Sequence, residues 1–243
     1  METLSTQGRR SHRVKKPVMA VAVFLLVYLV IAYGVLPFGW LRYESHHPSL
    51  DSVPNITRTR DDIPGDPLNV ALIGSETEVK KIFVKAGWYP ADPLTMRSCL
   101  EIAEASVLRR PYDEAPVSNL YLYGRKEDLA FEFPVGDDPR QRHHVRLWKS
   151  PVTDADGRPV WVGSATYDMR VGLSHTTGEV THHIAPDIDV ERDHLFASLK
   201  ATDDLAEIYN IPDFHKVREG RNGGGDPWHT DGNLTVGIIA QAP

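Results

Sequence analysis

The longest apolar run of the chain lies near its amino terminus. From Val18 to Leu36 there are nineteen residues without a charged or strongly polar side chain, and apolar residues continue to Leu41. A helix of that length is about 28 Å long, which is close to the thickness of the hydrocarbon core of a bilayer. The pattern therefore predicts a transmembrane anchor over residues 17–41.

A cleaved signal peptide is the competing interpretation of this run. Signal peptides have an apolar core of about 7–15 residues and end at a small-x-small cleavage site. The run here is longer and no convincing Ala-x-Ala follows it, so an uncleaved, single-pass signal anchor is favoured. Residues 1–16 hold five basic residues against one acidic residue, whereas only Arg42 closely follows the run. The positive-inside rule then places this basic tail in the cytoplasm and the rest of the chain on the outer side of the cytoplasmic membrane.

The residues after the anchor divide into a polar stretch and a longer patterned part. Residues 42–67 are polar and punctuated by prolines, without sustained apolar periodicity, which predicts a linker with short extended pieces. Residues 68–243 are long enough for one globular domain with a core of its own.

Within residues 68–243, short β-branched or aromatic runs are combined with three stretches of helical spacing. Ser75 fits a helix N-cap, Gly87 fits a helix end, and Asp154–Gly157 fits a hairpin turn. Helices before and after a run of strands, with few alternating βα units, predict an α+β fold with a mainly antiparallel sheet and about three helices. The predicted helices cover residues 75–87, 95–108 and a segment from Asp189, and the predicted strands cover residues 69–74, 119–123, 129–133, 143–148, 159–169, 205–209 and 234–240.

Charge and cysteine content narrow the possible classes of function. The formal net charge is −6 although the first residues are basic, so the remainder of the chain is acidic. An acidic body is not typical of a nucleic-acid-binding protein, and we expect no nucleic-acid partner. Cys99 is the only cysteine, which excludes an intramolecular disulfide and every multi-cysteine zinc site.

The stretch RQRHHVRLW, residues 140–148, concentrates two histidines and three arginines on one predicted strand. Alternate residues of a strand face opposite ways, so His143 lies on an apolar face while His144 and Arg146 share the other face. We predict that His143 packs inward. His144 and Arg146 are candidates for binding an anion or a carboxylate. The favoured alternative is structural, with Arg146 paired to an acid on a neighbouring strand such as Asp168.

A second polar stretch, THHIAPDID, covers residues 181–189. Its His182, His183 and Asp187 are further ligand-binding candidates. Neutral imidazole and carboxylate suit zinc, manganese or iron, so a divalent metal is the one cofactor that these residues suggest. The candidate metal ligands are His144, His182, His183 and Asp187.

These stretches also have structural interpretations. No HExxH helix is present, and Asp189 is explained as a helix N-cap that precedes Arg192 and Asp193 on a helix surface. GRNGGGDPWHTDG, residues 220–232, lacks the spacing of an EF-hand and is favoured as a structural glycine loop, although such a loop can form the rim of a site. A serine hydrolase is not expected, because no G-x-S-x-G elbow occurs.

Four segments, taken in order, resemble the motifs of the bacterial LssY C-terminal domain family: RQRHHVRLW, PVWVGSATYDMR, THHIAPDIDVERDH and GRNGGGDPWHTDG. The resemblance covers about residues 60–240, and the family has no assigned biochemical activity. Domains of this family also occur beside phosphatidic-acid-phosphatase-like and DedA-like membrane modules, which implies a cell-envelope setting with a protein or lipid-related partner. This chain has one apolar span in place of those modules, so their phosphatase activity is not carried over.

Three functions remain open from the sequence, and whether the protein is an enzyme stays undecided. The leading expectation is an envelope protein that is anchored in the lipid bilayer by its N-terminal helix and binds a ligand or a partner. The alternative is a hydrolase, with or without a metal ion, for a phosphorylated or lipid envelope compound; in the metal-dependent form the metal activates a water and Arg146 holds the anion. The third is a structural module whose polar clusters only tie strands together.

Overall fold

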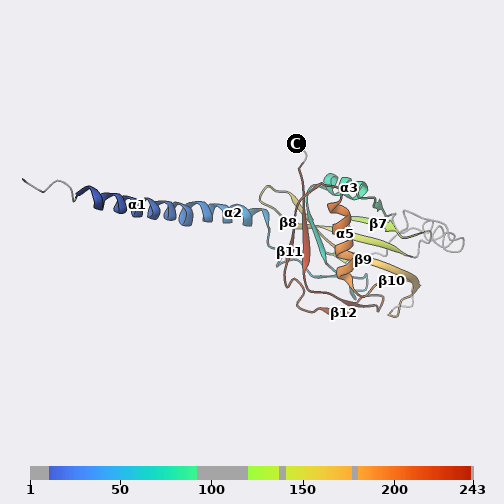
Figure 1. Cartoon of the computed structure of the whole chain (residues 1–243). Coiled ribbons are helices and arrows are strands. Elements are labelled where there is room, and N and C mark those ends of the chain that lie inside the picture. The colour runs from blue at the N-terminus through green and yellow to red at the C-terminus, as the bar shows by residue number, and fades with distance from the viewer. Residues whose placement is uncertain (1–10, 92–119, 137–140, 177–179, 242–243) are drawn as a thin grey trace, which may run out of the picture. The chain divides into compact units, whose positions relative to one another are not determined.

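The computed structural model describes residues 11–91, 120–136, 141–176 and 180–241 (Figure 1). The chain forms two compact units, Met1–Pro48 and Ser49–Pro243. The helix that we predicted over residues 95–108 lies outside the described residues.

The first unit is helical from Ser11 to His46. Helix α1 (Ser11–Val30) continues through a π-helical turn, η1 (Ile31–Val35), into α2 (Leu36–His46). The turn widens just before Pro37, because proline has no N–H to donate to the preceding turn and its ring crowds the carbonyl there. Segment Pro17–Ser45 is long and apolar enough to cross a membrane, which agrees with the predicted span, although a signal sequence shares these two properties.

The second unit begins earlier than the sequence suggested, so the linker predicted over residues 42–67 is too long. Leu50 and Val53 are buried, and strands β1 (Ile56–Arg58) and β2 (Pro64–Pro67) belong to the domain. These apolar residues are separated by prolines and polar residues and show no periodicity. They cover the sheet as an irregular layer, and only the tertiary contacts reveal that role.

An eight-stranded sheet forms the body of the domain, in the order β11-β14-β3-β9-β8-β7-β4, with β10 paired to β9. Its pairs are antiparallel except for β14 and β3, which run parallel. The predicted α+β class with a mainly antiparallel sheet is therefore confirmed. The strands are β3 (Val70–Ile73), β4 (Tyr89–Pro90), β7 (Leu129–Pro134), β8 (Arg142–Thr153), β9 (Pro159–Leu173), β10 (Val180–Ile184), β11 (Leu205–Ile211) and β14 (Leu234–Ile239).

Two smaller sheets complete the described part of the domain. One has the order β2-β1-β5-β6, with β5 (Tyr121–Leu122) and β6 (Arg125–Lys126). The other pairs β12 (Glu219–Arg221) with β13 (Pro227–His229) and so gives the glycine-rich segment a hairpin of its own.

Helices α3 (Glu76–Lys85) and α5 (Ile188–Lys200) cover one face of the large sheet. The predicted N-cap of α3 is confirmed, because Ser75 and Glu78 form a capping box that satisfies N–H groups left open by the first turn. The predicted end is confirmed as well: Gly87 has a φ of +86°, a left-handed conformation that costs glycine little. The core on this face joins apolar residues of both helices to the sheet: Val79, Ile82, Phe83, Leu195, Leu199, Val145, Leu147 and Trp161.

The opposite face of the sheet is covered by the irregular residues 50–68 and by strand β5. Leu50, Leu68 and Leu122 pack there against Trp148 on β8 and Val162 on β9. Alternation along β8 puts Arg146, His144 and Arg142 on the same face as Trp148. This face therefore changes from apolar to polar along a single strand, and the candidate site begins where it changes.

Strands β8 and β9 form the long hairpin on which the polar face is built. The turn predicted at Asp154–Gly157 is confirmed, since Asp154 Oδ1 accepts from Arg158 N at 2.8 Å. Both strands are longer than predicted, and β9 runs on to Leu173 to pair with β10. We did not predict β10, because the consecutive histidines in it show no alternation of apolar and polar residues.

Candidate functional site

The register of β7, β8 and β9 brings charged residues from three strands onto the polar face. Arg142 lies opposite Asp168, and His144 lies opposite both Thr166 and Glu132. The alternation predicted for RQRHHVRLW is therefore correct. These residues, together with Asp66, Arg146 and His182, are called the Asp168 cluster below.

Two arginines hold the cluster together through buried ion pairs. Arg142 donates from Nη1 to Glu132 Oε2 at 2.6 Å and from Nε to Asp168 Oδ2 at 3.1 Å. Arg146 donates from Nη1 to Asp66 Oδ2 at 3.2 Å. The prediction that Arg146 pairs with Asp168 is wrong, because the antiparallel register sets Arg142 opposite that carboxylate and leaves Arg146 to the β2 residue.

His144 is held as a neutral imidazole whose Nε2 accepts hydrogen bonds. Its Nε2 accepts from Arg146 Nη1 and from Thr166 Oγ1, each at 2.8 Å, so the proton resides on Nδ1. That Nδ1 lies 3.0 Å from Asp168 Oδ2. Burial lowers the pKa of His144, with Asp168 opposing and Arg146 reinforcing the shift. No lone pair is left for a metal ion, so this geometry does not suit the predicted ligand role of His144.

His182 joins the cluster from β10, with its Nδ1 4.0 Å from Asp168 Oδ2. Burial lowers the pKa of His182 to about 4, and Arg142 adds to this effect while Asp168 opposes it. Burial works against the charged form of Asp168, but His144, His182 and Arg142 outweigh it and hold the pKa of this carboxyl below its usual range. The carboxylate of Asp168 is thus ionised and the imidazole of His182 is neutral at neutral pH.

Some polar atoms of the Asp168 cluster have no hydrogen-bond partner among the described residues. They include Nε2 of His182, Oδ1 of Asp168 and Nδ1 of His144, and Oγ of Ser164 on the same face of β9 is in the same state. Buried polar atoms without partners are uncommon in folded proteins and mark places where a ligand or an ordered water can bind. Since the side chain of His182 is 13% exposed, the cluster reaches solvent at β10.

His183 lies outside the Asp168 cluster and contacts Asp226 of the glycine-rich segment. Its Nδ1 lies 2.6 Å from Asp226 Oδ1, and the backbone N–H of Ile184 donates to Asp226 Oδ2 at 3.3 Å. Asn222 accepts from Asp226 N through Oδ1 and donates from Nδ2 to Asp66 Oδ1 at 2.9 Å. The loop is therefore connected to the Asp168 cluster through Asn222 and Asp66.

Asp187, the last predicted site residue, serves a structural purpose. It is the N-cap of α5 and accepts from Asp189 N, so the prediction that Asp189 is the cap is wrong. Asp189 instead accepts from Thr230 Oγ1 at 2.8 Å and from Arg192 Nη1 at 3.0 Å. Arg192 is buried, which also corrects its predicted surface position.

His143 lies on the helix-covered face, as the alternation predicts. Its Nδ1 is 2.7 Å from Glu191 Oε2, and its ring stacks on His194 with 3.9 Å between the centroids. It is half-buried at the edge of the core and takes no part in the Asp168 cluster.

Several residues of the site were missed by sequence reasoning. Arg142 could have been predicted from the sequence, because it stands two residues before His144 on the same face of the same strand. No sequence pattern indicated Glu132, Asp66 or Asn222, since their role depends on strand order and on a loop that returns from elsewhere in the chain.

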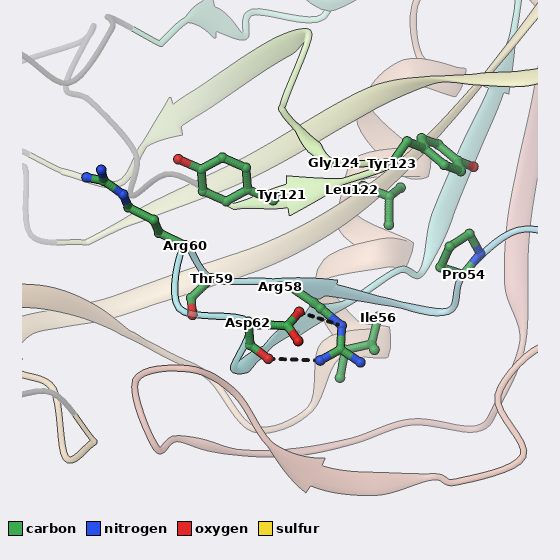
Figure 2. A pocket seen from close by; sticks show the side chains of 10 residues that line it. All are labelled: Pro54, Ile56, Arg58, Thr59, Arg60, Asp62, Tyr121, Leu122, Tyr123 and Gly124. Carbon is green, nitrogen blue, oxygen red and sulfur yellow. Dashed lines mark hydrogen bonds and ion pairs between the residues drawn. The ribbon is translucent and has the colours of Figure 1, made fainter.

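A surface pocket of about 330 Å³ lies on the β2-β1-β5-β6 sheet, and Figure 2 shows the side chains that line it. The guanidinium of Arg58 is turned toward Asp62 there, with Nη1 2.8 Å from its carbonyl oxygen and Nε 3.4 Å from its carboxylate (Figure 2). The charge of Arg58 is thus offset, and none of the four motif segments lines this pocket. We therefore place the candidate site at the Asp168 cluster.

A comparison with known protein families gives a match over the part of the chain that contains the Asp168 cluster. A family model described as LssY C-terminus matches residues 50–234, which includes all four motif segments and begins where the second compact unit begins. No curated protein and no solved structure matches the chain. The chain belongs to the LssY C-terminus family.

Proposed function

We propose that this protein is a single-pass, membrane-anchored envelope module that binds a small ligand at the Asp168 cluster, on the outer side of the cytoplasmic membrane. The observation that carries the proposal is the convergence of four separate motif segments on one buried polar network with uncommitted atoms at Asp168 and His182. A purely structural network is expected to satisfy most of its buried polar atoms, because each one costs free energy when it is buried without a partner.

The uncommitted atoms favour a ligand that donates hydrogen bonds. A carboxylate oxygen such as Asp168 Oδ1 can only accept. The attraction of Asp168 favours the proton of neutral His182 on Nδ1, so Nε2 is an acceptor too. Among the described side chains of the cluster, the carboxylates of Asp66, Glu132 and Asp168 outnumber the two guanidinium groups. A hydroxyl or an ammonium group suits this site, and a phosphate group does not.

Arg146 is poorly placed for the anion-holding role in the alternative hydrolase. Its Nη1 is already engaged by Asp66 and His144, and its side chain is 4% exposed. Moving it toward a phosphorylated substrate would leave the carboxylate of Asp66 buried without its cation, which is costly. The binding test below therefore includes inorganic phosphate, so that it can also reveal the alternative, a hydrolase of a phosphorylated compound.

Ligand binding is tested on the full-length protein in nanodiscs with ¹⁵N-labelled histidine. We expect ethanolamine or glucose to shift the imidazole signals of His182, while inorganic phosphate leaves them unchanged. His182→Gln should abolish binding, and His229→Ala, at an exposed histidine, should retain it. A phosphate response at His182 without a response to the two donors would favour the hydrolase instead.

The orientation of the protein is tested separately. Because the basic residues precede the apolar helix, we expect a reporter fused after Pro243 to be active on the extracytoplasmic side, with the protein retained in the membrane at full length. A cytoplasmic signal would contradict this topology. A shortened, released product would show that the helix is a cleaved signal sequence.

A further inference from the structure

A second constellation lies beside the Asp168 cluster, where the end of β9 meets β10 and the glycine-rich loop. One donor atom each from His175, His183 and Asp226 lies within 4.8 Å of the other two. His183 and Asp226 are buried, whereas His175 is exposed. We propose that these three residues bind a divalent transition-metal ion, in a site that is independent of the ligand proposed for the Asp168 cluster.

The separations suit such an ion after a small side-chain movement. Divalent zinc binds imidazole nitrogen and carboxylate oxygen at about 2.0–2.2 Å, so donors around one ion lie roughly 3–3.5 Å apart. His183 Nδ1 and Asp226 Oδ1 are 2.6 Å apart and would separate by roughly 0.5–1 Å around an ion, whereas a donor at the 4.8 Å limit would approach by roughly 1.5 Å. The exposed ring of His175 has room to make that movement.

The backbone of the loop brings His175 to this place. His175 N donates to Gly224 O at 2.9 Å, which ties the end of β9 to the loop that carries Asp226. A hydrogen bond that only fastened the loop to β10 would account for the contact between His183 and Asp226. It would not account for a second imidazole, whose ring centroid lies 5.2 Å from that of His183.

Two glycines make space for the imidazole rings. A Cβ at position 172 would lie 2.7 Å from His183 Nε2, so Gly172 allows that ring to lie against β9. A Cβ at position 225 would lie 2.7 Å from the Cβ of His175, and Gly225 also has a φ of +86° that favours glycine. The positions of both rings therefore depend on the absence of a neighbouring side chain.

The carboxylate of Asp226 is oriented by its surroundings, as in established metal sites. Ile184 N donates to its Oδ2, and Asn222 fixes the backbone of the loop by accepting from Gly224 N at 3.1 Å and Asp226 N at 2.9 Å. These contacts leave Oδ1 facing His183.

The donor set indicates which ions suit the site. Two imidazoles and one carboxylate bind zinc, manganese, iron, cobalt and nickel better than calcium or magnesium, which prefer oxygen alone. Three protein ligands also leave at least one coordination position open to water or to another molecule. Because His175 is exposed, an ion at this site is reachable from solvent.

The test uses full-length protein in nanodiscs, stripped with EDTA and titrated with zinc by calorimetry and with cobalt by ligand-field absorption. We expect one ion per chain in the wild type. His175→Ala should weaken zinc binding at least about 10-fold, because even residues behind the ligands change metal affinity by about 10–100-fold. Since His175 is exposed, this variant keeps its fold, which circular dichroism verifies. Asp226→Asn and Gly172→Ala should weaken binding too.

Two matched controls make the assignment specific. His229→Ala removes an exposed histidine outside the constellation, and His182→Ala removes the neighbour that belongs to the Asp168 cluster; both should bind zinc like the wild type. The proposal is overturned if the wild type binds no ion, if His175→Ala binds zinc as tightly as the wild type, or if His182→Ala alone loses the ion. The ligand proposed for the Asp168 cluster is measured at His182 with EDTA present, so the two proposals can fail separately.

Discussion

Replacing Arg142 by methionine is expected to lower the free energy of unfolding of the domain by about 3–5 kcal/mol, the cost typical of breaking a buried ion pair. The side chain of Arg142 is 2% exposed, and it supplies charge-assisted hydrogen bonds to both Glu132 and Asp168. Removing the guanidinium leaves these two carboxylates buried without that cation. Methionine fills much of the same volume, so the loss is mainly electrostatic. Urea denaturation of the protein in detergent, followed by tryptophan fluorescence, measures the change.

An exposed arginine provides the matched control. Arg218 pairs with Asp213 at 2.8 Å, but the two side chains are 56% and 62% exposed. Solvent screens such a pair, and Arg218→Met should change stability by less than about 1 kcal/mol. Arg142→Lys retains the charge without the planar fork and should fall between the two. Equal stability of Arg142→Met and Arg218→Met would show that the ion pairs of the cluster contribute nothing.

Acidification from pH 6.5 to pH 4 is expected to lower the stability of the domain by about 3 kcal/mol through His182 alone. Burial holds the pKa of His182 near 4 in the folded protein, against 6.5 as its ordinary value. Between these two values the unfolded chain binds a proton that the folded domain does not, so stability is lost as pH falls. Above pH 6.5 the imidazole is neutral in both states and the dependence vanishes. His144, whose pKa is also lowered, adds to the loss in the same direction.

Denaturation curves measured from pH 4 to pH 7.5 with EDTA present check this expectation. His182→Gln cannot take up a proton, so its stability should depend less steeply on pH by about one proton. Protonation of Asp168 does not contribute to the difference between the two pH profiles. Its pKa is lowered from 3.8 in the folded state, so the stability that its carboxylate gives the domain is lost only at lower pH. Parallel pH profiles for the wild type and His182→Gln would refute the assignment of a buried neutral imidazole.

Features that depend on residues close together in the sequence were predictable. The capping box at Ser75, the glycine that ends α3 and the turn at Asp154–Gly157 each arise within a few residues. A carboxylate at the start of α5 was expected as well, but two aspartates fit the same local signal. A tertiary contact separates them, because Thr230, from the glycine-rich segment, donates to Asp189, while Asp187 is the cap.

The candidate site was predicted only in part. The alternation in RQRHHVRLW correctly placed His144 and Arg146 on one face, since a strand has a fixed period of two. Partners across strands depend on register, which alternation does not specify, and so Arg146 was paired with the wrong carboxylate. Asp66 came from a segment without any pattern, and it connects Arg146 to the glycine loop through Asn222.

The sequence by itself determined the apolar helix, the α+β class, the polar face of β8 and the family resemblance, because each depends on composition, period or local motif. Only the tertiary structure decided which charges neutralise one another and which histidines remain available. His144 lost its lone pair to Arg146, whereas His175 came within reach of His183 through a loop almost fifty residues further along the chain. The physical reason is burial. A buried charge or polar group costs free energy unless it is paired, and which groups are buried is a property of the folded chain alone.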